Sequence, residues 1–208
     1  MKKQKIMAGM LGLSLMLAGC GYTPAGDCPD GLDSLKIGKD GDVTYTYRGS
    51  FAEDYYELDG LKELASEAVK EYNADYGKEV VSLGEVSLAE GTTDVAQMQL
   101  LFTDSSAVYG MTDVYLFYGT AAEAAVSEKS PGGTALHSVS GGGAATLLEL
   151  ISGGTDGHVI VTDLKGAVIS PYDVSYVSDG VTVVTGENGA YIETINVTAD
   201  YAVIILKK

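Results

Sequence analysis

A single long stretch of helical periodicity, at residues 60–76, stands in a chain that turn signals otherwise divide into short strand-like segments. The apolar and aromatic residues that recur there at helical spacing are Leu61, Leu64, Ala65, Ala68, Val69, Tyr72 and Tyr76. Asp59 is the expected N-cap, and Gly77 stands where a left-handed C-cap residue is expected. A helix with this apolar stripe needs a surface to cover it, and we expect one face of a β-sheet to do so.

The segments around this helix have the composition of strands. Residues 43–47 alternate β-branched and aromatic side chains after the turn signal Asp40-Gly41-Asp42. After the helix we predict three strands and then a short Ala-rich helix, at residues 80–88, 95–103, 113–118 and 121–126, with turn-rich segments at 90–94 and 104–111. This order predicts an α+β domain over residues 35–127, in which an antiparallel sheet packs against one long amphipathic helix.

A change of composition marks the predicted domain boundary. Gly, Ser and Pro supply ten of the seventeen residues at 127–143, and we interpret residues 128–143 as a linker. Residues 144–208 are predicted to be a mainly β domain, either a small sandwich or a meander of hairpins. Its predicted strands are 158–162, 167–170, 174–177, 181–185, 190–197 and 201–206. Because residues 202–206 have no polar alternation, we expect them to form a buried central strand.

The N-terminus has the layout of an export signal. Three lysines, at positions 2, 3 and 5, precede an apolar run at residues 6–17, which is shorter than the ~20 residues of a membrane span. The run ends in Leu17-Ala18-Gly19-Cys20, which resembles the lipobox of bacterial lipoproteins. The resemblance implies that residues 1–19 are a cleaved signal peptide and that Cys20 carries a diacylglycerol on its sulfur. An ordinary signal peptide followed by a chance cysteine is the alternative.

The resemblance also implies a location outside the cytoplasm, at the outer face of a bacterial cell membrane. Two acyl chains, such as palmitate, suffice for stable anchoring. The chain has 29 Asp and Glu against 13 Lys and Arg, a net charge of −16, and loss of the signal peptide would change this to −19. An acidic surface repels anionic lipids and polyanions, so we expect membrane contact through lipidated Cys20 alone and no nucleic-acid partner.

Lipid on Cys20, as the resemblance implies, would exclude an internal disulfide. If Cys20 carries lipid, Cys28 is the only other cysteine in the chain. Cys28 lies within residues 20–34, which are rich in Gly, Pro and Asp and which we predict to be a flexible tether. A catalytic thiol has to be held near a base, so this position argues against a cysteine nucleophile.

The predicted long helix carries an acidic row with a spacing of four residues: Asp59, Glu63, Glu67, Glu71 and Asp75. Neighbours in such a row repel by roughly 0.2–0.5 kcal/mol per pair. One interpretation is a surface for a cationic partner or for Ca²⁺. We favour a solvated outer face, because a calcium site draws its oxygens from a loop that can wrap the ion, and we predict no metal site.

Two sharper hypotheses concern His137-Ser138-Val139-Ser140 and the three glycines that follow. The first hypothesis is a phosphate-binding loop ahead of a helix at 144–151. The segment lacks the Lys-Ser/Thr of the Walker pattern, which argues against it. The second hypothesis is a serine nucleophile beside His137. The Gly-x-Ser-x-Gly motif of such nucleophiles is absent from the segment, which argues against it. His158 is expected at a strand edge rather than as a base or a ligand. We therefore predict no catalytic residue and no cofactor.

Two classes of function stay open. The first is a non-catalytic surface module that binds a peptide, a glycan or another envelope partner, which the 14 Tyr and the lack of Trp permit. The second is a hydrolase of envelope polymers that uses two carboxylates. Since no motif marks such a pair among the 29 acids, we favour a binding or structural role over an enzyme.

Overall fold

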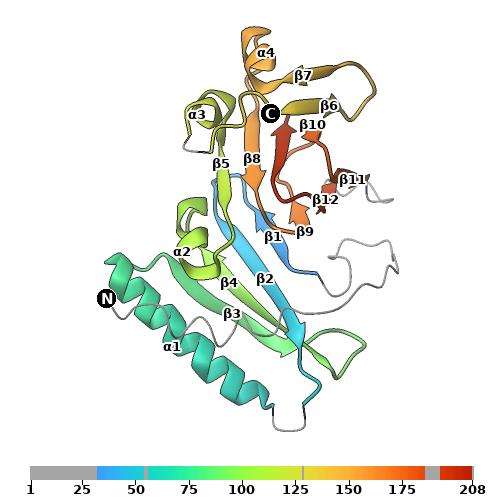
Figure 1. The fold of residues 1–208 in the computed structure, drawn as a ribbon. Coiled ribbons are helices and arrows are strands. Elements are labelled where there is room, and N and C mark those ends of the chain that lie inside the picture. The colour runs from blue at the N-terminus through green and yellow to red at the C-terminus, as the bar shows by residue number, and fades with distance from the viewer. Residues whose placement is uncertain (1–31, 54–55, 128, 186–192, 208) are drawn as a thin grey trace.

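The protein is described here by a computed structural model that covers residues 32–53, 56–127, 129–185 and 193–207. Its fold is α+β, with two β-sheets and one longer helix that packs on strands (Figure 1). The predicted signal peptide, Cys20 and Cys28 lie outside the described residues. The predictions for them are therefore not tested by the fold.

The first sheet has seven strands: β1 (Ser34–Ile37), β2 (Val43–Ser50), β3 (Val81–Leu88), β4 (Val95–Phe102), β9 (Gly166–Ile169), β11 (Val181–Thr185) and β12 (Glu193–Val197). Their order across the sheet is β11-β12-β9-β1-β2-β4-β3. β1 and β9 pair in parallel, and the other neighbours are antiparallel. Gly41, with a φ of 88°, lies in the β1–β2 turn that its Asp-Gly-Asp sequence predicts.

The second sheet has six strands: β5 (Leu116–Thr120), β6 (Ala135–Ser138), β7 (Ala144–Thr146), β8 (His158–Thr162), β10 (Val174–Ser178) and β13 (Ala202–Leu206). Their order is β5-β8-β13-β10-β6-β7, and all pairs are antiparallel. β13 lies between β8 and β10, and all five of its residues are buried. The buried central strand predicted from its unbroken apolar sequence is confirmed.

The long helix α1 (Leu58–Tyr76) packs along β3, with Ala65 and Val69 buried beneath it. Gly77 is the left-handed C-cap, as predicted. The N-cap prediction is wrong: the cap is Glu57, because its extended backbone already supplies the carbonyl that accepts the first helical hydrogen bond, from the Leu61 N–H. Leu64 was expected in the buried stripe but is 62% exposed, since α1 lies along the edge strand of the sheet.

Three short helices complete the described part of the chain: α2 (Val108–Thr112), preceded by a 3₁₀ turn at Ser105–Ala107, α3 (Ala121–Ala125) and α4 (Leu147–Ser152). The segment predicted as turn-rich therefore holds a helix, because Ala107 and Val108 insert into the main core. α3 and α4 cover the second sheet through a smaller apolar cluster. No helix within the described ranges combines the length and the apolar character needed to cross a bilayer.

The main core draws side chains from both sheets and from α1, for example Leu35, Val69 and Ile204. Both sheets also combine strands from the two sides of residues 128–143, through the β1–β9 and β5–β8 pairs. The predicted linker contains β6, which pairs with β7 and β10. The division into two domains stays a prediction.

Candidate functional site

A shallow, open groove of about 640 Å³ lies where α1 begins, close to the end of β2 and to the β3–β4 turn. Ligand sites in proteins commonly have volumes of about 300–1,000 Å³. We call this feature the α1 groove, and its lining residues are Phe51, Glu53, Tyr56, Glu57, Leu58, Asp59, Leu88 and Thr93.

Backbone hydrogen bonds hold the aromatic part of the α1 groove. The Phe51 N–H donates to the Asp94 carbonyl at 2.6 Å and so carries the β2–β4 pairing one step past the strand end. The Tyr56 N–H donates to the Glu53 carbonyl at 3.0 Å. The two rings, Phe51 and Tyr56, lie with their centroids 5.3 Å apart at an angle of 30°. They form an aromatic floor near the first turn of α1.

Three carboxylates line the same groove. Glu53, Glu57 and Asp59 are all exposed. The N-terminal end of a helix contributes only about half a positive charge. Three formal negative charges exceed that, so the groove keeps a net negative potential above its aromatic and aliphatic floor.

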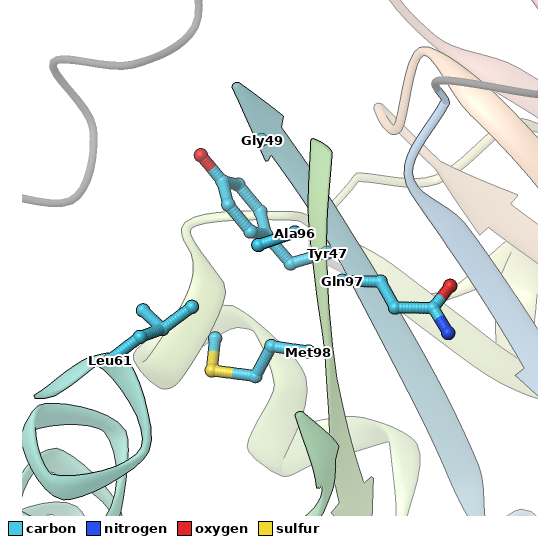
Figure 2. Close-up of a pocket in the computed structure, with 6 residues that line it drawn as sticks. All are labelled: Tyr47, Gly49, Leu61, Ala96, Gln97 and Met98. Carbon is cyan, nitrogen blue, oxygen red and sulfur yellow. The ribbon is translucent and has the colours of Figure 1, made fainter. Parts of the chain in front are cut away.

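A small apolar cavity of about 40 Å³ lies between α1 and the first sheet. Its lining residues are Tyr47, Gly49, Leu61, Ala96, Gln97 and Met98. In Figure 2 the side chains of Leu61 and Met98 meet on the helix side of the sheet, whereas Gln97 extends away on the other side. Burial, followed by the charge of Asp33, raises the pKa of Tyr47.

Asp33 fixes the start of β1 against β2. One carboxylate oxygen accepts the Tyr45 hydroxyl at 2.6 Å, and the other accepts the Arg48 backbone N–H at 2.8 Å. Burial raises the pKa of Asp33, and these two hydrogen bonds oppose that rise. The next residue, Ser34, is buried and begins β1, so the described end of the predicted tether is part of the fold.

His158 lies at the start of β8, inside an aromatic stack. Its ring centroid is 5.2 Å from that of Tyr118 and 5.7 Å from that of Tyr172, and Lys39 Nζ lies 5.5 Å from the Tyr172 centroid. Tyr118 Oη and His158 Nδ1 are buried without a hydrogen-bond partner among the described residues. Burial is the largest of the effects that raise the pKa of Tyr118 to about 12.

The other candidate residues from the sequence have different hydrogen-bond partners in the structure. The His137 ring lies 3.0 Å from Asp179, while the Ser138 hydroxyl pairs with Ser140 at 3.1 Å. The acidic row on α1 is exposed, and only Asp59 from it lines the groove. Across the described ranges, no three or more His, Cys, Asp and Glu side chains gather as a metal site would require.

The aromatic floor of the α1 groove was not predicted. Its one local signal is the pattern of aromatic residues next to acids at 51–57. Leu88 and Thr93 line the groove because β3 pairs with β4 and so brings the turn between them to the start of α1. Local sequence does not predict this pairing. No protein-family model, curated protein or solved structure matches this chain.

Proposed function

We propose that this protein is an extracytoplasmic binding module, held to a bacterial membrane by lipid on Cys20, whose α1 groove binds peptide segments that carry a cationic side chain. The observation that supports this ligand is the joint presence of an aromatic floor and three carboxylates in one groove. Lysine and arginine combine an apolar stem with a charged head. The stem packs on Phe51 and Tyr56, and the head pairs with the carboxylates.

A hydrolase of envelope polymers is the second candidate. Glu53, Glu57 and Asp59 all line the shallow α1 groove, and two carboxylates are the minimum for glycoside cleavage. This candidate would be favoured over the binding module if the protein turned over an envelope polysaccharide. Glu53→Gln or Glu57→Gln would then have to abolish turnover in a protein that still folds.

The anchor is tested by substituting the proposed lipid-bearing residue. A Cys20→Ala variant is expected to lose acyl labelling and to leave the detergent phase, because the acyl chains supply the membrane affinity. Cys28→Ala is the matched control and is expected to keep both properties. Unchanged partitioning of the Cys20→Ala variant would contradict the anchor.

The ligand class is tested with the mature full-length chain in detergent and a fluorescein-labelled Gly-Lys-Gly-Gly peptide. The combined variant Glu53→Gln, Glu57→Gln and Asp59→Asn is expected to bind about tenfold more weakly by fluorescence anisotropy, since exposed charge pairs each contribute up to about 1 kcal/mol. Added salt is expected to weaken wild-type binding.

A control variant removes equal charge elsewhere on the same helix. Glu63→Gln, Glu67→Gln and Glu71→Gln lie on the exposed face of α1 outside the groove. This variant is expected to bind within twofold of wild type. An equal loss of affinity in both triple variants would show that the peptide is attracted to the acidic protein as a whole. That result would contradict a specific site.

A further inference from the structure

We infer that Tyr115 and Asp163 form a binding site for a primary ammonium group, and that the protein's own Lys129 fills this site. By filling it, Lys129 latches residues 129–134, which we call the strap, against the second sheet. None of these residues lines the α1 groove, so the inference is independent of the proposed peptide site.

Strand pairing holds the two residues of the site together. Tyr115 directly precedes β5, and Asp163 directly follows β8. The Asp163 N–H donates to the Tyr115 carbonyl at 3.3 Å, and one oxygen of the Asp163 carboxylate accepts the Tyr115 N–H at 2.7 Å. The β5–β8 pairing therefore continues one residue past both strands, and it fixes a carboxylate at the same end of the sheet as an aromatic ring.

The ammonium of Lys129 contacts both groups. Its Nζ lies 4.1 Å from the centroid of the Tyr115 ring and 3.7 Å from Oδ2 of Asp163. An ammonium within about 6 Å of a ring centroid is attracted to the negative face of the ring, and the carboxylate adds attraction between opposite charges. The side chains of Lys129 and Asp163 are 46% and 32% exposed. A small cation in solution can therefore reach the site once Lys129 leaves it.

The polar contacts of the strap with the second sheet gather at Lys129. Besides the two contacts of its ammonium, the Lys129 carbonyl accepts the hydroxyl of Tyr201, which precedes β13. The next strap residues bond locally in the described part of the chain. The Ser130 hydroxyl donates to the Ala125 carbonyl at the end of α3, and the Thr134 N–H donates within the strap. One residue thus joins the strap to the sheet.

Lifting of the strap would empty the site. Tyr115 and Tyr201 are half-buried and pack against the smaller apolar cluster of the second sheet, and Lys129 contacts both of them. Further along the strap, Gly132 is buried beside Leu148 of α4. Release of the ammonium site and opening of the strap are therefore one event.

The latch is tested by hydrogen exchange of the Gly132 and Thr134 amides in the mature full-length chain, measured by nuclear magnetic resonance. Lys129→Met keeps an apolar side chain and removes the ammonium. Exchange of the strap amides is expected to rise about tenfold, because the cation–π contact and the ion pair are lost together. Exchange of the β13 amides is expected to stay unchanged.

Two matched variants show whether the ammonium itself is responsible. Lys129→Arg is expected to keep strap exchange within twofold of wild type, because a guanidinium also stacks on rings and pairs with carboxylates. Lys165→Met removes an ion pair of the same type, with Asp200, outside the strap. This control is also expected to leave strap exchange within twofold of wild type.

The ammonium site is tested in Lys129→Ala, which removes the internal occupant. The probe is n-butylammonium chloride, whose cation has the four carbons and the ammonium of a lysine side chain. We expect the Tyr115 ring protons to shift saturably with this salt and not with KCl at the same concentration. Wild type is expected to bind about tenfold more weakly, because the site is open only while the strap is lifted. Adding Asp163→Asn to Lys129→Ala is expected to abolish the shift.

Each experiment can overturn the inference. Unchanged strap exchange in Lys129→Met, or an equal rise in the strap and β13 amides, would show that Lys129 does not latch a separate strap. The absence of a saturable shift in Lys129→Ala would show that the site does not take an ammonium group from solution. Lys129→Gln replaces Lys129→Ala in this test if that variant does not fold by circular dichroism.

Discussion

Two tyrosines of the folded chain, Tyr45 and Tyr118, differ in whether the buried hydroxyl is hydrogen-bonded. The buried Tyr45 donates to Asp33 at 2.6 Å. The Tyr118 hydroxyl is buried and has no hydrogen-bond partner among the described residues. A buried hydroxyl without a hydrogen-bond partner lowers the free energy of unfolding, whereas a hydrogen-bonded one stabilises the group that it contacts. The two positions therefore give a matched test of how each hydroxyl affects folding.

We expect Tyr118→Phe to leave the free energy of unfolding unchanged or to raise it by up to about 1 kcal/mol, because the change removes an unsatisfied polar atom and keeps the ring on His158. Tyr45→Phe is expected to lower it by about 1–3 kcal/mol, because the buried Asp33 carboxyl loses a donor. Urea denaturation at neutral pH measures both values. A loss above 1 kcal/mol in Tyr118→Phe would mean that its hydroxyl has a partner in solution.

At the scale of elements, one side chain joins the end of α1 to the first strand after it. Asn73 Nδ2 donates to the Val81 carbonyl at 2.7 Å, and Asn73 Oδ1 accepts the N–H groups of Val80 and Val81 at 2.9 and 3.1 Å. Val80 and Val81 are both buried. The side chain thus satisfies backbone groups that cannot reach water, and it sets where β3 starts relative to the helix.

Asn73→Ala is expected to lower the free energy of unfolding by about 2–3 kcal/mol, since it leaves buried backbone groups without partners. Ser66→Ala is the control: its hydroxyl bonds only to the Lys62 carbonyl one turn earlier in the same helix, and we expect a change within about 0.5 kcal/mol. Urea denaturation of both variants checks the difference. Equal effects would show that the hydrogen bonds of Asn73 to β3 add nothing.

The sequence predicts the elements whose signals are local. Strands 158–162 and 181–185 have the predicted ends, because Gly-containing turns bound them. Helices α3 and α4 carry a Thr-x-x-Glu capping box, at Thr120–Glu123 and Thr146–Glu149, which is a local sequence signal for the start of a helix. The α1 groove was not predictable in this way, because Leu88 joins Phe51 only after β2, β3 and β4 have paired.

Across the whole molecule, the chain leaves the first sheet after β4, builds the second sheet with β5–β8, and returns with β9 to pair in parallel with β1. It then alternates between the sheets, because β10 and β13 lie in the second sheet while β11 and β12 lie in the first. Composition predicts a linker at 128–143, but it carries no information on β6 within that range, since pairing between distant strands leaves no mark in local sequence. Removal of either half would expose core residues of the other.

We therefore expect the mature chain to unfold in a single cooperative transition, with tyrosine fluorescence and far-ultraviolet circular dichroism changing at the same urea concentration. β6 and its partners β7 and β10 should also protect residues 135–138 from limited proteolysis, because a protease needs an extended segment free of hydrogen bonds. The domain division predicted from composition requires the opposite results. Two separate transitions, together with early cleavage within 128–143 that releases two folded fragments, would support that division and contradict a shared core.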